Sequence, residues 1–142
     1  MKKTFLFLFI ISAFIMSSCD VGSAEKMADE FHQHLKAGEY DYIADNMLDE
    51  ESLVITPRAE WISLFSGMRE FYGPILEISK DMGFESSYND GITTVKFDYT
   101  ITFENLKIYE LIYFVDRGQG YKISGILYNE DFSALERQSE NF

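Results

Sequence analysis

The first half of the chain carries apolar residues at helical spacing. Between residues 23 and 38 these residues recur every three or four positions, which places them on one side of a helix. They are Ala24, Met27, Ala28, Phe31 and Leu35. Ser23 is a suitable N-cap, and Gly38 is a suitable C-terminal stop. The pattern predicts an amphipathic helix that must lie on another apolar surface.

Two further helices are expected before residue 75. A shorter apolar stripe over residues 41–48 predicts the second helix. For the third, Thr56 is expected to be the cap and Pro57 the first helical residue. The apolar residues that follow, from Trp61 to Tyr72, form a broad stripe that ends at Gly73-Pro74. All three helices are amphipathic, so each is expected to pack on a sheet.

After Pro74 the apolar and polar residues alternate, which is typical of strands. Four strands are predicted, over residues 76–88, 94–103, 107–115 and 121–128. Asn89-Asp90-Gly91 is a hairpin signal, and residues 117–120 form another short turn. Short turns between strands predict an antiparallel meander. Residues 129–142 are expected to be a frayed polar tail with at most one helical turn.

The predicted fold class is α+β, with three N-terminal helices packed on one face of a curved four-stranded antiparallel sheet. The domain is expected to cover residues 24–128 and to form a roll. Three stretches carry a resemblance to the nuclear-transport-factor-2-like (cystatin-like) superfamily: LKAGEYD over 35–41, TPRAEW over 56–61 and YKISG over 121–125. The resemblance implies a conical cavity between helices and sheet, and often dimers through the open sheet face. Some members are isomerases or dehydratases, and many have no catalytic residues.

The N-terminal residues resemble the signal of a bacterial lipoprotein. Lys2 and Lys3 precede an apolar run over residues 4–16, which is shorter than the roughly 20 residues of a membrane span. Ser17-Ser18-Cys19 follows, as in a lipobox. The resemblance implies a signal peptide over residues 1–18, acylation of Cys19 and a tether over residues 19–23. The alternative is an ordinary signal peptide followed by a buried free cysteine.

Such a protein would be extracytoplasmic and anchored by lipid in the bacterial cell envelope, in either the inner or the outer membrane. The 142-residue chain has 12 basic and 24 acidic residues. Loss of Lys2 and Lys3 with the signal leaves 10 against 24, a charge of −14. This balance argues against nucleic acid as a partner. The single cysteine excludes an internal disulfide and a cysteine-rich zinc site.

No metal or cofactor is expected. His32 and His34 are two positions apart, which points them in different directions from a helix. Both are expected at the boundary of the apolar stripe or in solvent, although either could serve as an acid–base group. The acidic stretch over residues 39–51 lacks the spacing and glycine of a calcium loop. A solvated helical face explains it more simply.

Among the acidic residues, Glu110 is the candidate for acid–base catalysis. Its neighbours on the same strand face, Ile108 and Ile112, are apolar, so the carboxylate is paired, part of an apolar binding face, or functional. Asp98 also lies at the centre of a strand, but on the polar side, and is expected to face solvent.

Aromatic side chains predict a ligand-binding or interaction surface formed by Trp61, Tyr99, Tyr109 and Tyr113. The strand over residues 107–115 is apolar on both faces, and one helix layer covers only one of them. A second copy or an envelope protein is expected on the other face, unless these are ordinary exposed aromatics. The favoured function is a non-enzymatic binding or interaction module. The alternatives are a ligand carrier or isomerase-like enzyme that uses the cone, and a regulator or inhibitor of an envelope protein.

Overall fold

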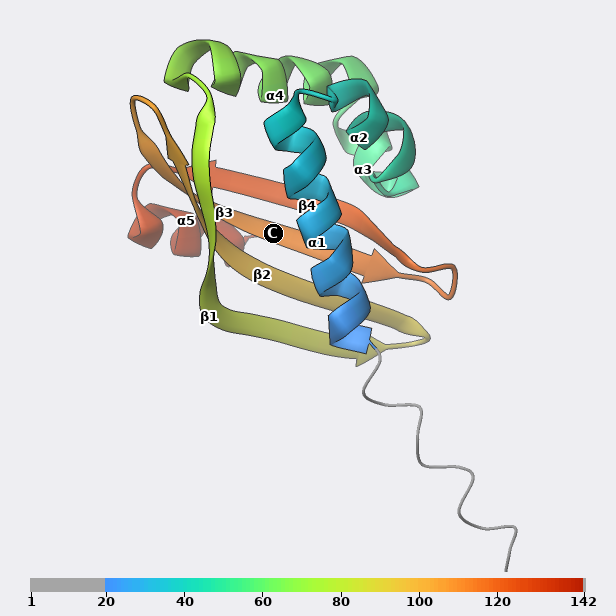
Figure 1. Ribbon diagram of the computed structural model, residues 1–142. Coiled ribbons are helices and arrows are strands. Elements are labelled where there is room, and N and C mark those ends of the chain that lie inside the picture. Colours follow the sequence, from blue (N-terminus) through green and yellow to red (C-terminus); the bar gives the residue numbers. More distant parts are fainter. Residues whose placement is uncertain (1–19, 142) are drawn as a thin grey trace, which may run out of the picture.

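The computed structural model describes residues 20–141, and it confirms the α+β class (Figure 1). Cys19 and the predicted signal peptide over residues 1–18 lie outside the described residues. The helices are α1 (Asp20–Ala37), α2 (Tyr40–Asn46), α3 (Glu50–Ile55), α4 (Arg58–Tyr72) and α5 (Phe132–Ser139). The strands are β1 (Ile75–Asn89), β2 (Ile92–Phe103), β3 (Lys107–Asp116) and β4 (Tyr121–Asn129).

The prediction of three helices before the sheet was wrong, because α3 forms a fourth. The Asp49 side chain caps α3 by accepting a hydrogen bond from the backbone N–H of Glu51. Thr56, expected to cap α4, instead ends α3, and Pro57 precedes α4 without a side-chain cap. α1 also begins at Asp20, so it includes residues that the sequence assigned to a tether.

The sheet is an open antiparallel meander in the order β1-β2-β3-β4. Asp90 and Gly91 adopt positive φ values of 49° and 84°, as the tight β1–β2 hairpin requires. β1 has a register shift between Lys80 and Phe84, and Figure 1 shows the strand bending in its course. At the opposite edge, the backbone of Met47 and Asp49 bonds to both sides of Ile123 on β4.

The main core lies between the inner face of the sheet and helices α1 and α4. Alternate residues of β2 are buried on this face, as the pattern predicts. These are Val95, Phe97, Tyr99, Ile101 and Phe103. Phe31 of α1 meets Phe65 of α4 above them, with ring centroids 5.9 Å apart in an edge-on arrangement.

The outer face of the sheet is covered in part by the chain itself. Residues 129–142 were expected to be a frayed tail, but α5 forms there and packs on β3 and β4. Leu135 of α5 and Leu111 of β3 are both buried, and the rings of Phe132 and Tyr109 meet edge-on at 5.5 Å. An intramolecular helix therefore covers apolar surface for which the sequence suggested another molecule.

None of the helices within residues 20–141 is long and apolar enough to cross a membrane.

Candidate functional site

A buried pair of ionisable side chains, His32 and Glu110, lies between α1 and the sheet. Strand alternation places Glu110 on the inner face of β3, where its side chain is 0% exposed. His32 of α1 is 6% exposed, and its Nε2 lies 2.7 Å from Oε1 of Glu110. This corrects the expectation that His32 lies at the boundary or in solvent. It also gives Glu110 the partner that a buried carboxylate needs.

Two tyrosines flank Glu110 on the neighbouring strands. Tyr99 of β2 and Tyr128 of β4 are its direct cross-strand partners. The ring of His32 meets that of Tyr99 edge-on, with centroids 4.3 Å apart. We call His32, Tyr99, Glu110 and Tyr128 the polar row. It crosses three strands of an otherwise apolar face, where each polar group carries a desolvation cost.

The place of Tyr128 in the polar row depends on a bulge in β4. Before the bulge Phe114 pairs with Ile123, and after it Tyr113 pairs with Gly125. The register shift adds one residue to β4, which reverses the faces of all later side chains. Without the extra residue, Tyr128 would point to the outer face. The bulge therefore completes the polar row.

Burial sets the proton affinity of both phenols. Burial, followed by the nearby Glu110 carboxylate, raises the pKa of Tyr128 well above its usual value. Burial also raises the pKa of Tyr99, with a further contribution from the charges of Asp29 and Glu110. Both phenols therefore keep their protons at pH values well above the physiological range. Oε2 of Glu110 and the Tyr128 hydroxyl are buried, and neither meets hydrogen-bond geometry with a partner within residues 20–141.

The polar row reaches the surface at an open groove between α1 and β1. The groove has a volume of about 390 Å³, and it is lined by Asp29, His32, Gln33, Lys36, Ile78, Lys80 and Tyr99. We call it the α1–β1 groove. Lys80 extends over the ring of Phe97, 4.3 Å from its centroid, and contacts Glu25. Lys36 donates a hydrogen bond to the Leu76 carbonyl at 3.3 Å.

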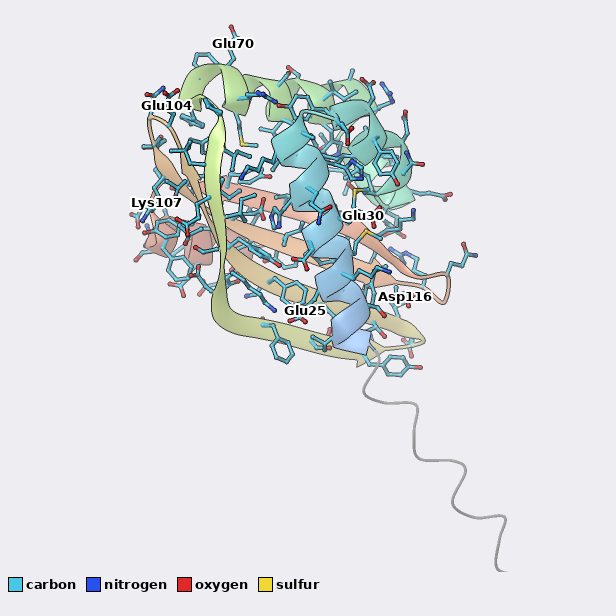
Figure 2. The ribbon with its side chains drawn as sticks, in the orientation of Figure 1. Glu25, Glu30, Glu70, Glu104, Lys107 and Asp116 are labelled. Atoms are coloured by element: carbon cyan, nitrogen blue, oxygen red, sulfur yellow. The ribbon has the colours of Figure 1, made fainter. Side chains whose placement is uncertain are left out.

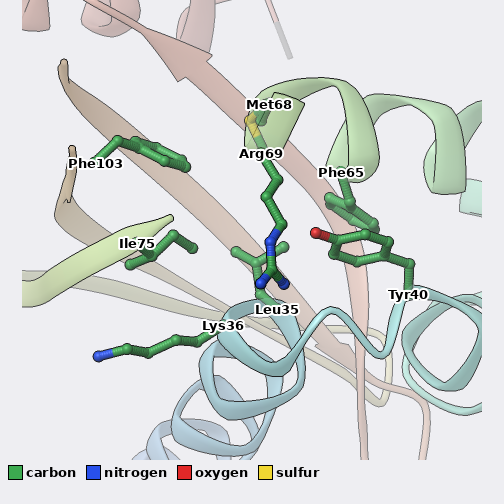
Figure 3. A pocket seen from close by; sticks show the side chains of 8 residues that line it. All are labelled: Leu35, Lys36, Tyr40, Phe65, Met68, Arg69, Ile75 and Phe103. Carbon is green, nitrogen blue, oxygen red and sulfur yellow. The ribbon is translucent and has the colours of Figure 1, made fainter. Parts of the chain in front are cut away.

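A second groove of about 380 Å³ opens at the other end of the polar row. It is lined by Leu64, Met68, Tyr72, Ile108, Tyr128, Asn129 and Glu130. A much smaller space, of about 10 Å³, lies between the ends of α1 and α4 (Figure 3). Figure 3 shows the Arg69 guanidinium pointing toward the end of α1 beside Leu35. This space holds at most one water molecule, so it is a packing gap rather than a ligand site.

The other aromatic candidates lie apart from the polar row. Tyr109 and Tyr113 are on the outer face, and burial raises the pKa of Tyr113. Trp61 is in the core, stacked on Phe65 with ring centroids 5.7 Å apart. Of the four residues expected to form one surface, only Tyr99 lines the α1–β1 groove. Cys19, the expected lipid attachment site, lies outside the described residues.

Two acidic residues of the predicted acidic stretch share one basic partner. Arg58 bonds to Asp41 and Asp45 at 2.7 and 2.5 Å, and this hydrogen bonding lowers the pKa of Asp45. Asp98 was expected to face solvent, but it is half-buried on the outer face, and burial raises its pKa. Within the described residues, His, Cys, Asp and Glu side chains do not gather in groups of three that could hold a metal.

The polar row brings together an imidazole, a carboxylate and two phenols, groups that in general can hydrogen-bond a ligand or transfer a proton. The sequence marked Glu110 by its apolar neighbours, and it marked His32 only as a weak candidate. His32 and Glu110 meet because of the way α1 crosses the sheet. This crossing cannot be read from the residues next to either side chain in the sequence. A buried imidazole beside a carboxylate is a common acid–base arrangement, provided that a substrate reaches the imidazole. No family model, curated protein or solved structure matches this chain.

Proposed function

We propose that the protein is an extracytoplasmic lipoprotein, anchored through Cys19, whose domain binds a small ligand without chemical turnover. Two basic residues, an apolar run and Ser-Ser-Cys support the anchor. The resemblance to the nuclear-transport-factor-2-like superfamily supports the domain, because helices lie over one face of a curved sheet and ligands in that fold enter between the two layers. The assignment to the bacterial cell envelope follows from the lipobox.

The observation that carries ligand binding is the contact between the α1–β1 groove and the polar row. Binding sites combine a concave surface with a few convergent polar groups. Here His32 and Tyr99 connect the groove to the buried Glu110, and Ile78 supplies an apolar contact. An otherwise apolar core has no structural need for a buried pair of ionisable side chains, because such a pair stabilises a fold weakly at best.

Charge indicates the class of ligand. Two lysines, Lys36 and Lys80, line the groove together with one acidic residue, Asp29, and Lys80 also contacts Glu25. Two lysines in one groove stand out on a chain with twice as many acidic as basic residues. A small carboxylate with an apolar or aromatic portion fits it, with the anionic group near the lysines and the apolar part on Ile78 and Tyr99.

The anchor is tested by replacing the cysteine. Cys19→Ala is expected to move the protein from the membrane fraction to the soluble fraction. Ser17→Ala is the matched control, because it keeps the cysteine, and it should leave the protein in membranes. Unchanged membrane partition of the Cys19→Ala protein contradicts the anchor.

Ligand binding is tested by native mass spectrometry of protein extracted gently from its host. A bound small molecule should appear as a discrete added mass, and its identity supplies the probe for titration. Lys80→Ala should weaken its binding about tenfold or more, as loss of a charge-assisted contact does. Lys107→Ala is the control, because this exposed lysine lies away from the groove (Figure 2). Equal affinities of the two variants contradict the groove as the site.

An acid–base enzyme of the isomerase or dehydratase type is the second candidate, and the His32–Glu110 contact favours it. In that case His32 would transfer the proton, and Glu110 would orient the imidazole and stabilise its charged form. The identified ligand should then be converted by the wild-type protein. Glu110→Gln should reduce kcat by at least tenfold while KM changes little. A ligand that remains chemically unchanged through prolonged incubation excludes this candidate.

A further inference from the structure

The beginning of α1 lies beside the end of β1. Lys36, near the C-terminus of α1, bonds to the Leu76 carbonyl, and Glu25, near its N-terminus, contacts Lys80. β1 therefore runs antiparallel to α1, and its later residues pass the start of the helix. Figure 1 shows the start of α1 next to the end of β1 and the β1–β2 hairpin.

Two exposed aromatic side chains lie on this part of β1. Phe84 is 54% exposed and Tyr88 is 74% exposed. They pair with Phe97 and Thr93, so strand alternation places both on the same face of the sheet as α1. The Phe84 ring lies 6.4 Å from that of Phe97, which joins it to the edge of the core. Tyr88 extends further out, beside the hairpin turn.

We infer that Phe84, Tyr88 and the first turn of α1 form a membrane-facing edge that rests on the lipid surface. This inference rests on the proposed lipid anchor. Cys19 immediately precedes Asp20, the first residue of α1, and consecutive Cα atoms are about 3.8 Å apart. Acyl chains on Cys19 would therefore hold the start of α1 within a few ångströms of the headgroups. An aromatic ring beside it reaches the interfacial layer, where Tyr side chains are favoured.

The charges at this edge indicate which lipid it suits. Glu85 contacts Lys96 at 2.9 Å and Glu25 contacts Lys80, so part of the acidic charge is compensated locally. Figure 2 nevertheless shows a further acidic side chain, Asp116, toward this end of the molecule. The membrane-facing edge is therefore suited to zwitterionic headgroups and relies on its aromatic rings rather than on basic residues.

The test places tryptophan at two matched positions in the full lipidated protein. Tyr88→Trp lies on the membrane-facing edge. Phe71→Trp is the control, because Phe71 is 80% exposed at the end of α4, far from the start of α1. Each protein is reconstituted into phosphatidylcholine vesicles with brominated acyl chains, which quench nearby tryptophan. Trp61, the single natural tryptophan, is buried and contributes the same background to both.

Brominated lipid should reduce the added emission of Tyr88→Trp, because aromatic rings of this kind are favoured at the interface, and leave that of Phe71→Trp unchanged. Phe84→Trp should behave like Tyr88→Trp, which guards against a local defect in one variant. If the proteins float with the vesicles but the edge variants are not quenched more than Phe71→Trp, the inference of a membrane-facing edge is wrong, while the proposed lipid anchor is supported. If the wild-type protein does not float with vesicles, both the anchor and the edge are wrong.

Discussion

The ring of Phe132 meets the ring of Tyr109 edge-on, and this contact fastens α5 to the outer face of the sheet. Beside it, Leu135 is completely buried on a helix of only eight residues. A helix of this length is unstable alone, so its apolar contacts with the sheet must hold it in place.

Leu135→Ala should therefore lower the free energy of unfolding by about 2–5 kcal/mol, the range for a buried leucine. Urea unfolding followed by circular dichroism measures the change. Glu136→Ala, an exposed change on the same helix, is the control and should shift stability by less than about 0.5 kcal/mol. Equal effects of the two substitutions would show that α5 does not pack as described.

Removal of one member of the buried pair should cost more than removal of both. Glu110→Leu leaves His32 without its partner, and His32→Leu leaves a buried carboxylate unpaired. Each single change is expected to destabilise the fold by about 3–5 kcal/mol, whereas the double variant should be close to the wild type or more stable. Urea midpoints of the four proteins form a double-mutant cycle. Additive single effects would contradict a direct interaction between the two side chains.

The buried tyrosines make the fold sensitive to alkali. An unfolded tyrosine loses its proton near pH 10, whereas burial raises the pKa of Tyr128 and of Tyr99 in the folded state. Above pH 10 the unfolded state releases protons that the folded state retains, so stability falls as pH rises. Each such group contributes a slope of about 1.4 kcal/mol per pH unit between its unfolded and folded pKa values.

Tyr128→Phe should reduce this alkaline loss, because phenylalanine does not titrate. The measurement is the melting temperature of both proteins between pH 8 and pH 11. Tyr88→Phe is the matched control, because Tyr88 is exposed and the same change there should leave the slope unaltered. Parallel curves for Tyr128→Phe and the wild type would contradict the assigned burial.

Asp98 is expected to destabilise the fold at neutral pH. Burial raises the pKa of Asp98 in the folded state, because the ionised carboxylate is poorly solvated there. The resulting loss of folding free energy is absent below the pKa of the unfolded state, near 4, and grows as the pH rises to the pKa of the folded state. Asp98→Asn should therefore stabilise the protein at pH 7, by about 0.5 kcal/mol after allowance for solvent screening, and have no such effect at pH 3. Urea midpoints at the two pH values measure it. A stabilisation that is the same at both would point to a cause other than charge.

The sheet could be predicted well because its signals are local. Alternation marks each strand within a few residues, and Asn89-Asp90-Gly91 specifies a hairpin through its own backbone preferences. α3 was missed because six residues are too few for a periodic stripe. α5 was missed for a related reason, since only a few of its residues are apolar and the rest resemble a solvated tail.

The polar row could be predicted only in part. Glu110 stood out because a charged residue broke an apolar strand face. Its contact with His32 depends on the crossing of α1 over the sheet, and the inward direction of Tyr128 depends on the bulge in β4. Neither is a property of neighbouring residues in the chain, so periodicity cannot reveal them.

Both edges of the sheet are interrupted, which limits how this protein can self-associate. The bulge between Lys80 and Phe84 breaks the hydrogen-bonding edge of β1 into two short stretches. At the other edge, the backbone of Met47 and Asp49 already occupies both bonding groups of Ile123. Within residues 20–141, an added strand from a second molecule would therefore find interrupted edges on both sides of the sheet, which opposes its growth into an extended fibre.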